Sequence, residues 1–353
     1  MTTTAAAPLV RAAARSWRCA PAPGAVRAFH AGLPGYAPTP LVEVPGLASE
    51  LGVGRVLVKD ESSRLGLPAF KALGASWAVH RVIAAAGGAS LTLVTATDGN
   101  HGRAVARMAR LRGQRAHVFV PRGVHARAVA AIADEQAEVT AVDGSYDDAV
   151  RAAAAAAEAP GRVLVQDTAW PGYEEIPGWI VEGYSTLCHE VDEQLAALGV
   201  VGPDLVGVPV GVGSLAQAVI THYRSRPDGH APALLGVETA AAACVLESLR
   251  AGAPTSVPTT PTIMAGLNAG TPSSTAWPYL RDGLDAAVAV TDADSARAAE
   301  DLAAAGLSSG PCGAATLAGL RAVLPTGGLG LGPGSVVVLL STEGRDANPH
   351  PTR

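Results

Sequence analysis

Lysine is almost absent from this 353-residue chain. Only two of its 26 Lys and Arg residues are lysines, Lys59 and Lys71, so covalent chemistry through a lysine amine has two candidates. Arginine cannot replace them, because its guanidinium stays protonated and forms no Schiff base at neutral pH. The four cysteines form no Cys-x-x-Cys pair, and the nine histidines show no spacing typical of a metal site. The sequence therefore indicates no zinc site, redox motif or disulfide framework.

Other classes of protein are excluded by further absences. No apolar run approaches the roughly 20 residues that span a bilayer, and a net charge of −5 with scattered arginines offers no basic stripe for nucleic acid. Residues 1–42 contain no Asp or Glu and four arginines. We interpret their first part as an Ala- and Arg-rich extension rather than a transit peptide, and no apolar segment of a secretory signal follows. We expect a protein of the reducing cytoplasm that contacts neither membrane nor nucleic acid.

The apolar pattern predicts an α/β fold. Short runs rich in Val and Leu alternate with Ala-rich segments of helical periodicity. The predicted strands are residues 55–59, 91–96, 116–120, 138–142, 162–166, 205–210, 233–238, 287–291 and 335–340, and the predicted helices include 103–112, 146–158, 176–198, 215–226 and 294–305. Strands that alternate with helices of this length favour right-handed crossovers and a mostly parallel sheet covered on both faces.

The two lysines lie close together in the sequence, in residues 58–71. Lys59 ends a predicted strand beside Asp60 and Glu61, and we interpret it as a solvated surface charge. Lys71 follows an apolar stretch and opens a predicted helix. A lysine desolvated at such a boundary loses affinity for its proton and becomes a usable amine, which favours Lys71 as the reactive one.

A second candidate site is the loop at residues 95–102, between a predicted strand and a predicted helix. Loops at the carboxyl edge of a parallel sheet present unpaired backbone N–H groups and a positive helix end, which suit a carboxylate or a phosphate. Asp98 fits a helix N-cap as well as a catalytic base. His101 fits a satisfied hydrogen-bonding residue better than a metal ligand.

A third candidate is the loop at residues 211–216, which matches Gly-x-Gly-x-x-Gly/Ala after a predicted strand. Glu238 ends the next strand, where a ribose-binding acid would lie in a dinucleotide fold. This keeps a nicotinamide-dependent oxidoreductase open as an alternative. Glycine-rich loops with a serine bind any phosphate monoester by the same physics, so the loop indicates phosphate more firmly than NAD.

Residues 60–71, Asp-Glu-Ser-Ser-Arg-Leu-Gly-Leu-Pro-Ala-Phe-Lys, resemble a segment of the diaminopropionate ammonia-lyases, which are pyridoxal-phosphate enzymes of fold type II, the tryptophan synthase β class. The resemblance extends from residue 29 to residue 344. It includes residues 97–103, 146–148, 166–170, 176–180, 211–213, 263–267 and 341–344. The fold implied is two three-layer αβα domains with mostly parallel twisted sheets. We expect an extension at 1–28, a large cofactor-binding domain at 29–75 and 185–353, and a small domain at 76–184.

The resemblance also implies the site. Lys71 would hold pyridoxal 5′-phosphate as a Schiff base, Asn100 would approach its hydroxyl, and Ser341 would face its pyridine nitrogen. The phosphate would lie on Gly211, Val212, Gly213, Ser214 and Leu215. Thr97, Asp98, Gly99, His101 and Asp167 would bind the substrate, its carboxylate through backbone N–H groups.

The implied reaction is α,β-elimination from 2,3-diaminopropionate or a close β-substituted amino acid, giving pyruvate or a related 2-oxo acid and ammonia. Asp98 or Lys71 would remove the Cα proton, with Asp98 on the D face, and Asp167 would bind the β-ammonium and help protonate the leaving group. The expected assembly is a homodimer. A serine/threonine dehydratase, a β-substitution enzyme and a catalytically inactive binding module on this fold remain alternatives.

The chain departs from the family pattern near the pocket. Leu65 and Pro68 replace the usual Phe and Asn, Pro171 replaces an acidic residue, and Ala269 replaces a cysteine, so no bridge to Cys244 is expected. These changes keep a modified amino acid open as the substrate.

Overall fold

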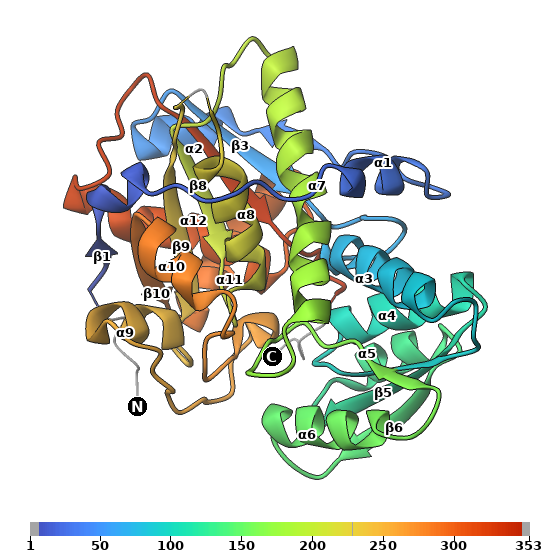
Figure 1. Ribbon diagram of the computed structural model, residues 1–353. Coiled ribbons are helices and arrows are strands. Elements are labelled where there is room, and N and C mark those ends of the chain that lie inside the picture. Colours follow the sequence, from blue (N-terminus) through green and yellow to red (C-terminus); the bar gives the residue numbers. More distant parts are fainter. Residues whose placement is uncertain (1–6, 228, 348–353) are drawn as a thin grey trace.

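The computed structural model describes residues 7–227 and 229–347 and contains two separate β-sheets (Figure 1). The larger sheet has the order β1-β10-β9-β8-β11-β3-β2, and the smaller has the order β6-β5-β4-β7. The strands of the larger sheet are β1 (Leu9–Val10), β2 (Leu41–Glu43), β3 (Arg55–Asp60), β8 (Leu205–Pro209), β9 (Ala233–Thr239), β10 (Ala286–Val290) and β11 (Val336–Ser341). Those of the smaller are β4 (Thr92–Ala96), β5 (Arg115–Pro121), β6 (Glu138–Val142) and β7 (Arg162–Leu164).

All strand pairs are parallel except β1 with β10 and β2 with β3. The predicted α/β class with mostly parallel sheets is thus confirmed. The two antiparallel strands lie at the edges of the large sheet, and neither was predicted, because strands of two or three residues leave almost no periodic signal. Strand β1 and the Trp17 ring, which packs edge-on against Tyr279, attach part of the predicted N-terminal extension to the large sheet.

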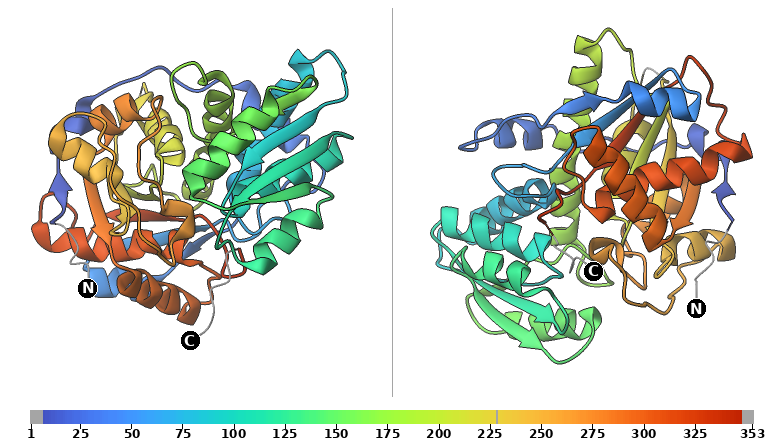
Figure 2. Two further views of the ribbon diagram at one scale, coloured as in Figure 1. Left: turned by 90° about the horizontal axis from the view of Figure 1, so that it is seen from below. Right: turned by 180° about the vertical axis from the view of Figure 1, so that it is seen from behind.

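Helices cover both faces of the large sheet (Figure 2). Helices α4, α5 and α6 instead pack against the small sheet. The helices of the described residues are α1 (Ala25–Ala31), α2 (Pro45–Leu51), α3 (Lys71–Ala85), α4 (Asn100–Leu111), α5 (Ala126–Ala133), α6 (Tyr146–Ala157), α7 (Glu175–Ala197), α8 (Ser214–Arg224), α9 (Cys244–Ala251), α10 (Trp277–Gly283), α11 (Asp292–Ala304) and α12 (Pro311–Val323). Along β11, Val337 and Leu339 pack into one core cluster and Val338 and Leu340 into another. Because successive side chains of a strand point to opposite faces, this strand is buried on both sides.

Helices α3 and α7 connect the two sheets and pack closely against each other. A Cβ at Gly74 would lie 2.6 Å from Cε1 of Tyr184, and one at Gly183 would lie 2.6 Å from the Leu73 carbonyl oxygen. Glycine at both positions therefore permits this approach, which fixes the first turn of α3, and Lys71 with it, against α7. No helix of the described residues is long and apolar enough to cross a membrane.

Candidate active site

A pocket opens at the carboxyl ends of both sheets, where the predicted loops meet. Strands β4 and β7 are parallel neighbours, so the residues that follow them, Asp98 and Asp167, lie at the same edge. The loop at 211–215 comes from β8 of the other sheet and faces them. Every predicted site residue except Ser341 lines this pocket.

Lys71 is the first residue of α3, and the segment before it is held against the end of β11. The Phe70 N–H donates to the Thr342 carbonyl at 3.1 Å, and the Gly344 N–H donates to the Pro68 carbonyl at 2.9 Å. The Lys71 ammonium donates to the Asp167 carboxylate. The chain thus presents its one pocket-lining lysine directly beside an acid.

The protonation of this pair differs from the sequence prediction. Burial acts to lower the pKa of Lys71, but the Asp167 carboxylate outweighs it and leaves the pKa above its ordinary value. Burial acts to raise the pKa of Asp167, but the charges of Lys71 and His101 bring it down to about 2. The expected loss of proton affinity at Lys71 is therefore wrong for this arrangement, because an ion pair outweighs desolvation.

Asp98 is not a helix cap. Helix α4 begins at Asn100 with Gly99 at its N-cap, and no side chain caps it. Burial and the nearby negative charge of Asp167 raise the pKa of Asp98 to about 7, although Lys71 acts to lower it. The two acids of the pocket therefore have opposite shifts, one ionised at all ordinary pH values and one titrating near neutrality.

The remaining residues of the 97–101 loop have distinct environments. The Thr97 hydroxyl accepts the N–H groups of Gly99 and Gly102 at 2.9 and 3.0 Å, so it shapes the loop. His101 Nε2 bonds to the Val165 carbonyl at 2.8 Å and must donate there. Its Nδ1 is buried without a hydrogen-bond partner and lies 3.9 Å from the Asp167 carboxylate.

The loop at 211–215 forms a cradle that needs glycine. Gly213 has φ of +104°, and a Cβ there would lie 2.7 Å from Leu280 Cδ1. A Cβ on Gly211 would lie 3.0 Å from the Gly266 carbonyl oxygen. Helix α8 begins at Ser214, so its first-turn N–H groups have no acceptor within the helix and point at the pocket as an anion site.

Asn100 is oriented by a residue that the sequence reasoning did not select. Its Nδ2 donates to the Glu343 carboxylate at 2.7 Å, and the Cys312 N–H donates to the same carboxylate at 3.3 Å. Ser341 lies below the lining, where its hydroxyl donates to that of Ser309 at 2.8 Å.

Further lining residues were missed as site residues. They are Phe70, Tyr146, Thr168, Pro209, Ala265, Gly266, Leu267, Asn268, Ala269, Cys312, Thr342 and Glu343. Tyr146, Thr168 and the 263–267 stretch lie in segments that carry the family resemblance, which is the signal that could have found them. Cys312 is a free thiol, as are the other three cysteines.

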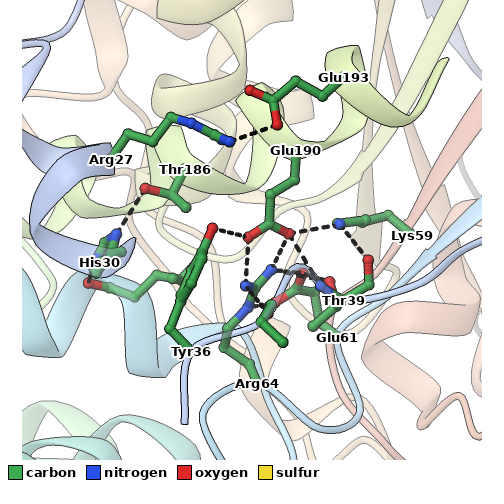
Figure 3. Close-up of polar contacts among 12 residues, drawn as sticks. Arg27, His30, Tyr36, Thr39, Lys59, Glu61, Arg64, Thr186, Glu190 and Glu193 are labelled. Atoms are coloured by element: carbon green, nitrogen blue, oxygen red, sulfur yellow. Dashed lines mark hydrogen bonds and ion pairs between the residues drawn. The ribbon is translucent and has the colours of Figure 1, made fainter. Parts of the chain in front are cut away.

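Lys59 lies outside the pocket and is fully buried, so its interpretation as a solvated charge is wrong. Its ammonium donates to the Thr39 carbonyl at 2.7 Å, to Glu190 at 2.7 Å and to the Gln194 side-chain oxygen at 2.9 Å. Figure 3 shows it in an ionic cluster, which we define as Lys59, Glu61, Arg64 and Glu190. The prediction failed because Glu190 is 131 residues away in sequence.

Glu238 is also outside the pocket. Its carboxylate accepts the N–H groups of Val245 and Leu246, each at 2.7 Å, at the first turn of α9. The acid that a dinucleotide-binding interpretation requires is therefore engaged in holding a helix, and that alternative loses its second motif.

The pocket fits pyridoxal phosphate. It combines a lysine amine, a glycine cradle at a helix N-terminus that suits a phosphate, and the side-chain amide of Asn100. Buried polar atoms of the lining, among them His101 Nδ1 and Asn268 Oδ1, have no hydrogen-bond partner in the described residues. Unsatisfied buried polar atoms in a pocket indicate a polar occupant.

Comparisons with known proteins agree. The family model described as pyridoxal-phosphate dependent enzyme matches residues 33–343. The diaminopropionate ammonia-lyase of Salmonella typhimurium is 40% identical over 295 residues, covering 77% of this chain and 73% of that protein. Two crystal structures of the Escherichia coli diaminopropionate ammonia-lyase match with a TM-score of 0.84, covering 91% of this chain and 88% of that chain. One, 36% identical, contains an aminoacrylate-PLP azomethine reaction intermediate, and the other, 35% identical, contains D-serine.

The family match spans almost the whole chain, and the pocket combines a lysine amine with a glycine loop at a helix N-terminus. The chain belongs to the pyridoxal-phosphate dependent enzymes, within the group that includes the diaminopropionate ammonia-lyases.

Proposed function

We propose that this enzyme catalyses α,β-elimination from 2,3-diaminopropionate or a close β-substituted amino acid. Elimination and hydrolysis convert one diaminopropionate and one water into one pyruvate and two ammonia molecules. Bound pyridoxal phosphate supplies an electron sink that acidifies the substrate Cα–H bond. The enzyme would work in the cytoplasm as a homodimer.

The observation that carries the proposal is the pair of acids beside Lys71 with opposite pKa shifts. A general base must be ionised near the working pH and yet basic enough to take a proton. Asp98, with a pKa of about 7, meets both conditions. We assign it the Cα proton of a D-configured substrate, and Lys71 the proton on the opposite face.

Asp167 suits a different task. Its pKa is held down to about 2 by the Lys71 ammonium and by His101, so it is the acid of the pair that is ionised beside an ammonium. The Lys71 ammonium in contact with it demonstrates that a primary ammonium fits there. We assign Asp167 to the substrate β-ammonium, because keeping that amine protonated lets it leave as neutral ammonia.

The substrate carboxylate is assigned to the start of α4. The N–H groups of its first turn have no acceptor within the helix, and the positive end of the helix dipole favours an anion there. Gly211 to Leu215 would hold the cofactor phosphate, and Asn100 the cofactor hydroxyl. Glu343 accepts from the Asn100 amide and so orients it.

The test is release of 2-oxo acid and ammonia from a panel of amino acids. The panel contains D- and L-2,3-diaminopropionate, D- and L-serine and L-threonine. We expect the diaminopropionates to have the highest kcat/KM, because only they offer Asp167 a β-ammonium. A higher kcat/KM for L-serine and L-threonine would contradict the proposal and favour a hydroxyamino-acid dehydratase.

A matched variant sharpens this test. Asp167→Asn removes the charge and keeps the size of the side chain. It should lower kcat/KM for diaminopropionate more than for D-serine, since the hydroxyl of serine carries no positive charge. An equal loss for both substrates would reject Asp167 as the β-ammonium site. The assembly is tested by sedimentation, where a mass of about twice 35.4 kDa is expected.

A further inference from the structure

A second cavity lies beside the active pocket, and the proposed reaction does not use it. It has a volume of about 210 Å³. Its lining consists of Gly99, Asn100, Arg103, Arg127, Ala128, Ala131, Asp346 and Ala347. Helices α4 and α5, which pack side by side (Figure 1), provide most of its wall. The cavity shares Gly99 and Asn100 with the active pocket, so the first turn of α4 separates the two.

Arg103 brings a positive charge that its neighbours leave largely uncompensated. Its nearest acid, Glu135, lies 3.8 Å from Nε, which is buried without a hydrogen-bond partner. Glu135 already accepts hydrogen bonds from Nε and Nη2 of Arg107, each at 2.5 Å, and from Nη2 of Arg110 at 2.9 Å. Three arginines of one helix therefore share a single carboxylate.

Arg127 adds a second guanidinium to the same cavity. It is exposed, and within the described residues no ion pair of its side chain is found. The only acid of the lining is Asp346, which is exposed. The lining thus carries two guanidinium groups against one carboxylate, and Glu135 beside Arg103 is shared among three arginines, so positive charge is in excess here.

We propose that this cavity binds a small organic anion with two or more negative charges, a dicarboxylate or a phosphate monoester. The planar guanidinium forks of Arg103 and Arg127 match the oxygens of carboxylate and phosphate in a bidentate way. The N-terminal end of α4 adds its partial positive charge at Gly99 and Asn100. Neutral and cationic amino acids find no acidic partner there except Asp346.

Binding in this cavity is coupled to the active pocket through Asn100. The residue lines both cavities, and its amide is held by Glu343 on the active-pocket side. An anion that contacts the first turn of α4 therefore changes the surroundings of the neighbouring site, and by linkage the effect is reciprocal.

The test is calorimetric titration of the cofactor-loaded enzyme with succinate and with inorganic phosphate at constant ionic strength. Saturable binding of at least one probe is expected. Arg103→Gln and Arg127→Gln should each weaken it about tenfold or more, since each removes a charge-assisted contact worth a factor of that size. Arg127 is exposed, so its variant tests the site without a risk to folding.

Arg122→Gln is the matched control. Arg122 is also an exposed arginine, and it lies outside the cavity, where it pairs with Asp143 at 2.6 Å. Its variant should bind the probes like the parent enzyme. Affinity unchanged in both cavity variants, an equal loss in the control, or no saturation by either probe would overturn the proposal. Because binding is measured without turnover, these outcomes do not depend on the proposed elimination.

The anion could be a free metabolite or the acidic end of an elongated substrate, and one further titration distinguishes the two. The titration is repeated with D-serine saturating the active pocket of the Asp98→Asn variant, which should keep the cofactor and turn D-serine over about 10² to 10⁴ times more slowly than the parent enzyme. Probe binding that persists assigns the cavity to a free anionic metabolite that binds together with the amino acid. Probe binding that is lost, while still sensitive to Arg127→Gln, assigns it to the acidic end of an elongated substrate. Displacement by D-serine with no sensitivity to either arginine would place the probe in the active pocket and reject the site.

Discussion

The two lysines of the chain lie twelve residues apart and have contrasting environments. Lys59 donates to three acceptors and belongs to a cluster of two cations and two carboxylates that is fully buried (Figure 3). Lys71 donates to one carboxylate, and its amine faces a pocket. The Lys59 side chain is fully buried and that of Lys71 is 21% exposed, so neither is the solvated surface charge that an isolated lysine usually is, and exposure alone says little about the role of each.

The difference lies in what surrounds the amine. At Lys59 all three N–H groups are satisfied within the protein, and the residue lines neither of the two cavities described above, so a ligand would have to displace a hydrogen bond. At Lys71 the amine faces a pocket with room for a carbonyl compound, and the Asp167 carboxylate accepts a hydrogen bond from the amine when it is protonated. The number of satisfied donors and the access to a cavity therefore indicate the role of each lysine better than its exposure.

The largest loss of activity is expected at Lys71, the lysine that faces the pocket. Lys71→Ala should lower release of 2-oxo acid from diaminopropionate by more than about a thousandfold, because no other side chain of the pocket provides an amine. Lys59→Met should leave the kcat of the folded fraction within about threefold, since Lys59 touches no pocket residue. Comparable losses of kcat in the two variants would contradict the assignment of Lys71 as reactive and Lys59 as structural.

Asp98→Asn comes next and tests the base beside Lys71. A loss of about 10² to 10⁴ in kcat is expected for a D-configured substrate, with the visible absorption of the cofactor retained. Because burial and Asp167 raise the pKa of Asp98 to about 7, the activity of the parent enzyme should rise with pH through this value as the carboxylate ionises. The variant should lack that inflection. An unchanged pH profile would reject Asp98 as the base.

The structural side of the comparison is tested at Glu190. Glu190→Gln leaves Lys59 and Arg64 with one carboxylate between them, and a loss of about 3–5 kcal/mol in the free energy of unfolding is expected. The double variant Lys59→Met/Glu190→Leu keeps the cluster neutral through Glu61 and Arg64. It should lose less than Glu190→Gln in urea unfolding, and a larger loss would contradict the ionic account.

The loss of stability in Glu190→Gln should also depend on pH. Burial acts to raise the pKa of Glu190, but Arg64 and Lys59 bring it from its usual 4.5 to about 2. Its contribution to stability is therefore complete above about pH 4.5 and disappears as pH falls towards 2. The difference in stability between the parent and Glu190→Gln should shrink over this range. A difference that stays constant from pH 6 to pH 3 would argue against a charged Glu190.

The smallest effect on stability is expected at a surface ion pair of β3, the strand that also carries Lys59. Arg55 donates to Glu43 at 2.6 and 2.8 Å on the protein surface. Arg55→Gln should change the free energy of unfolding by less than about 1 kcal/mol, because water and salt screen such pairs. A loss as large as that of Glu190→Gln would show that burial is not what makes the ionic cluster important.

The sequence predicted the backbone well and side-chain partners less well. All nine predicted strands are present to within two residues at each end, since Val- and Leu-rich runs between helices carry a strong local signal. The antiparallel edge strands β1 and β2 were missed because they are short. The loops that follow β4 and β8 were predicted as sites because the carboxyl edge of a parallel sheet collects such loops, whereas Asp167 after β7 was predicted from the family resemblance alone.

Partners that are distant in sequence could not be predicted. Lys59 was misjudged because Glu190 and Gln194 come from α7, and the proton affinity of Lys71 because Asp167 is 96 residues away. Glu343 was not selected because its role depends on a contact with Asn100 across 243 residues. Charge and hydrogen-bond networks of this kind follow from tertiary packing and leave no local pattern.

The most direct test of the division between the two lysines is the visible absorption spectrum of the two lysine variants. Lys71→Ala and Lys59→Met are purified in parallel, incubated with pyridoxal phosphate and dialysed. We predict that the Schiff-base band is absent from Lys71→Ala and present in folded Lys59→Met. A band that survives in Lys71→Ala, or that disappears only in Lys59→Met, would contradict the assignment of Lys71 as the residue that holds the cofactor.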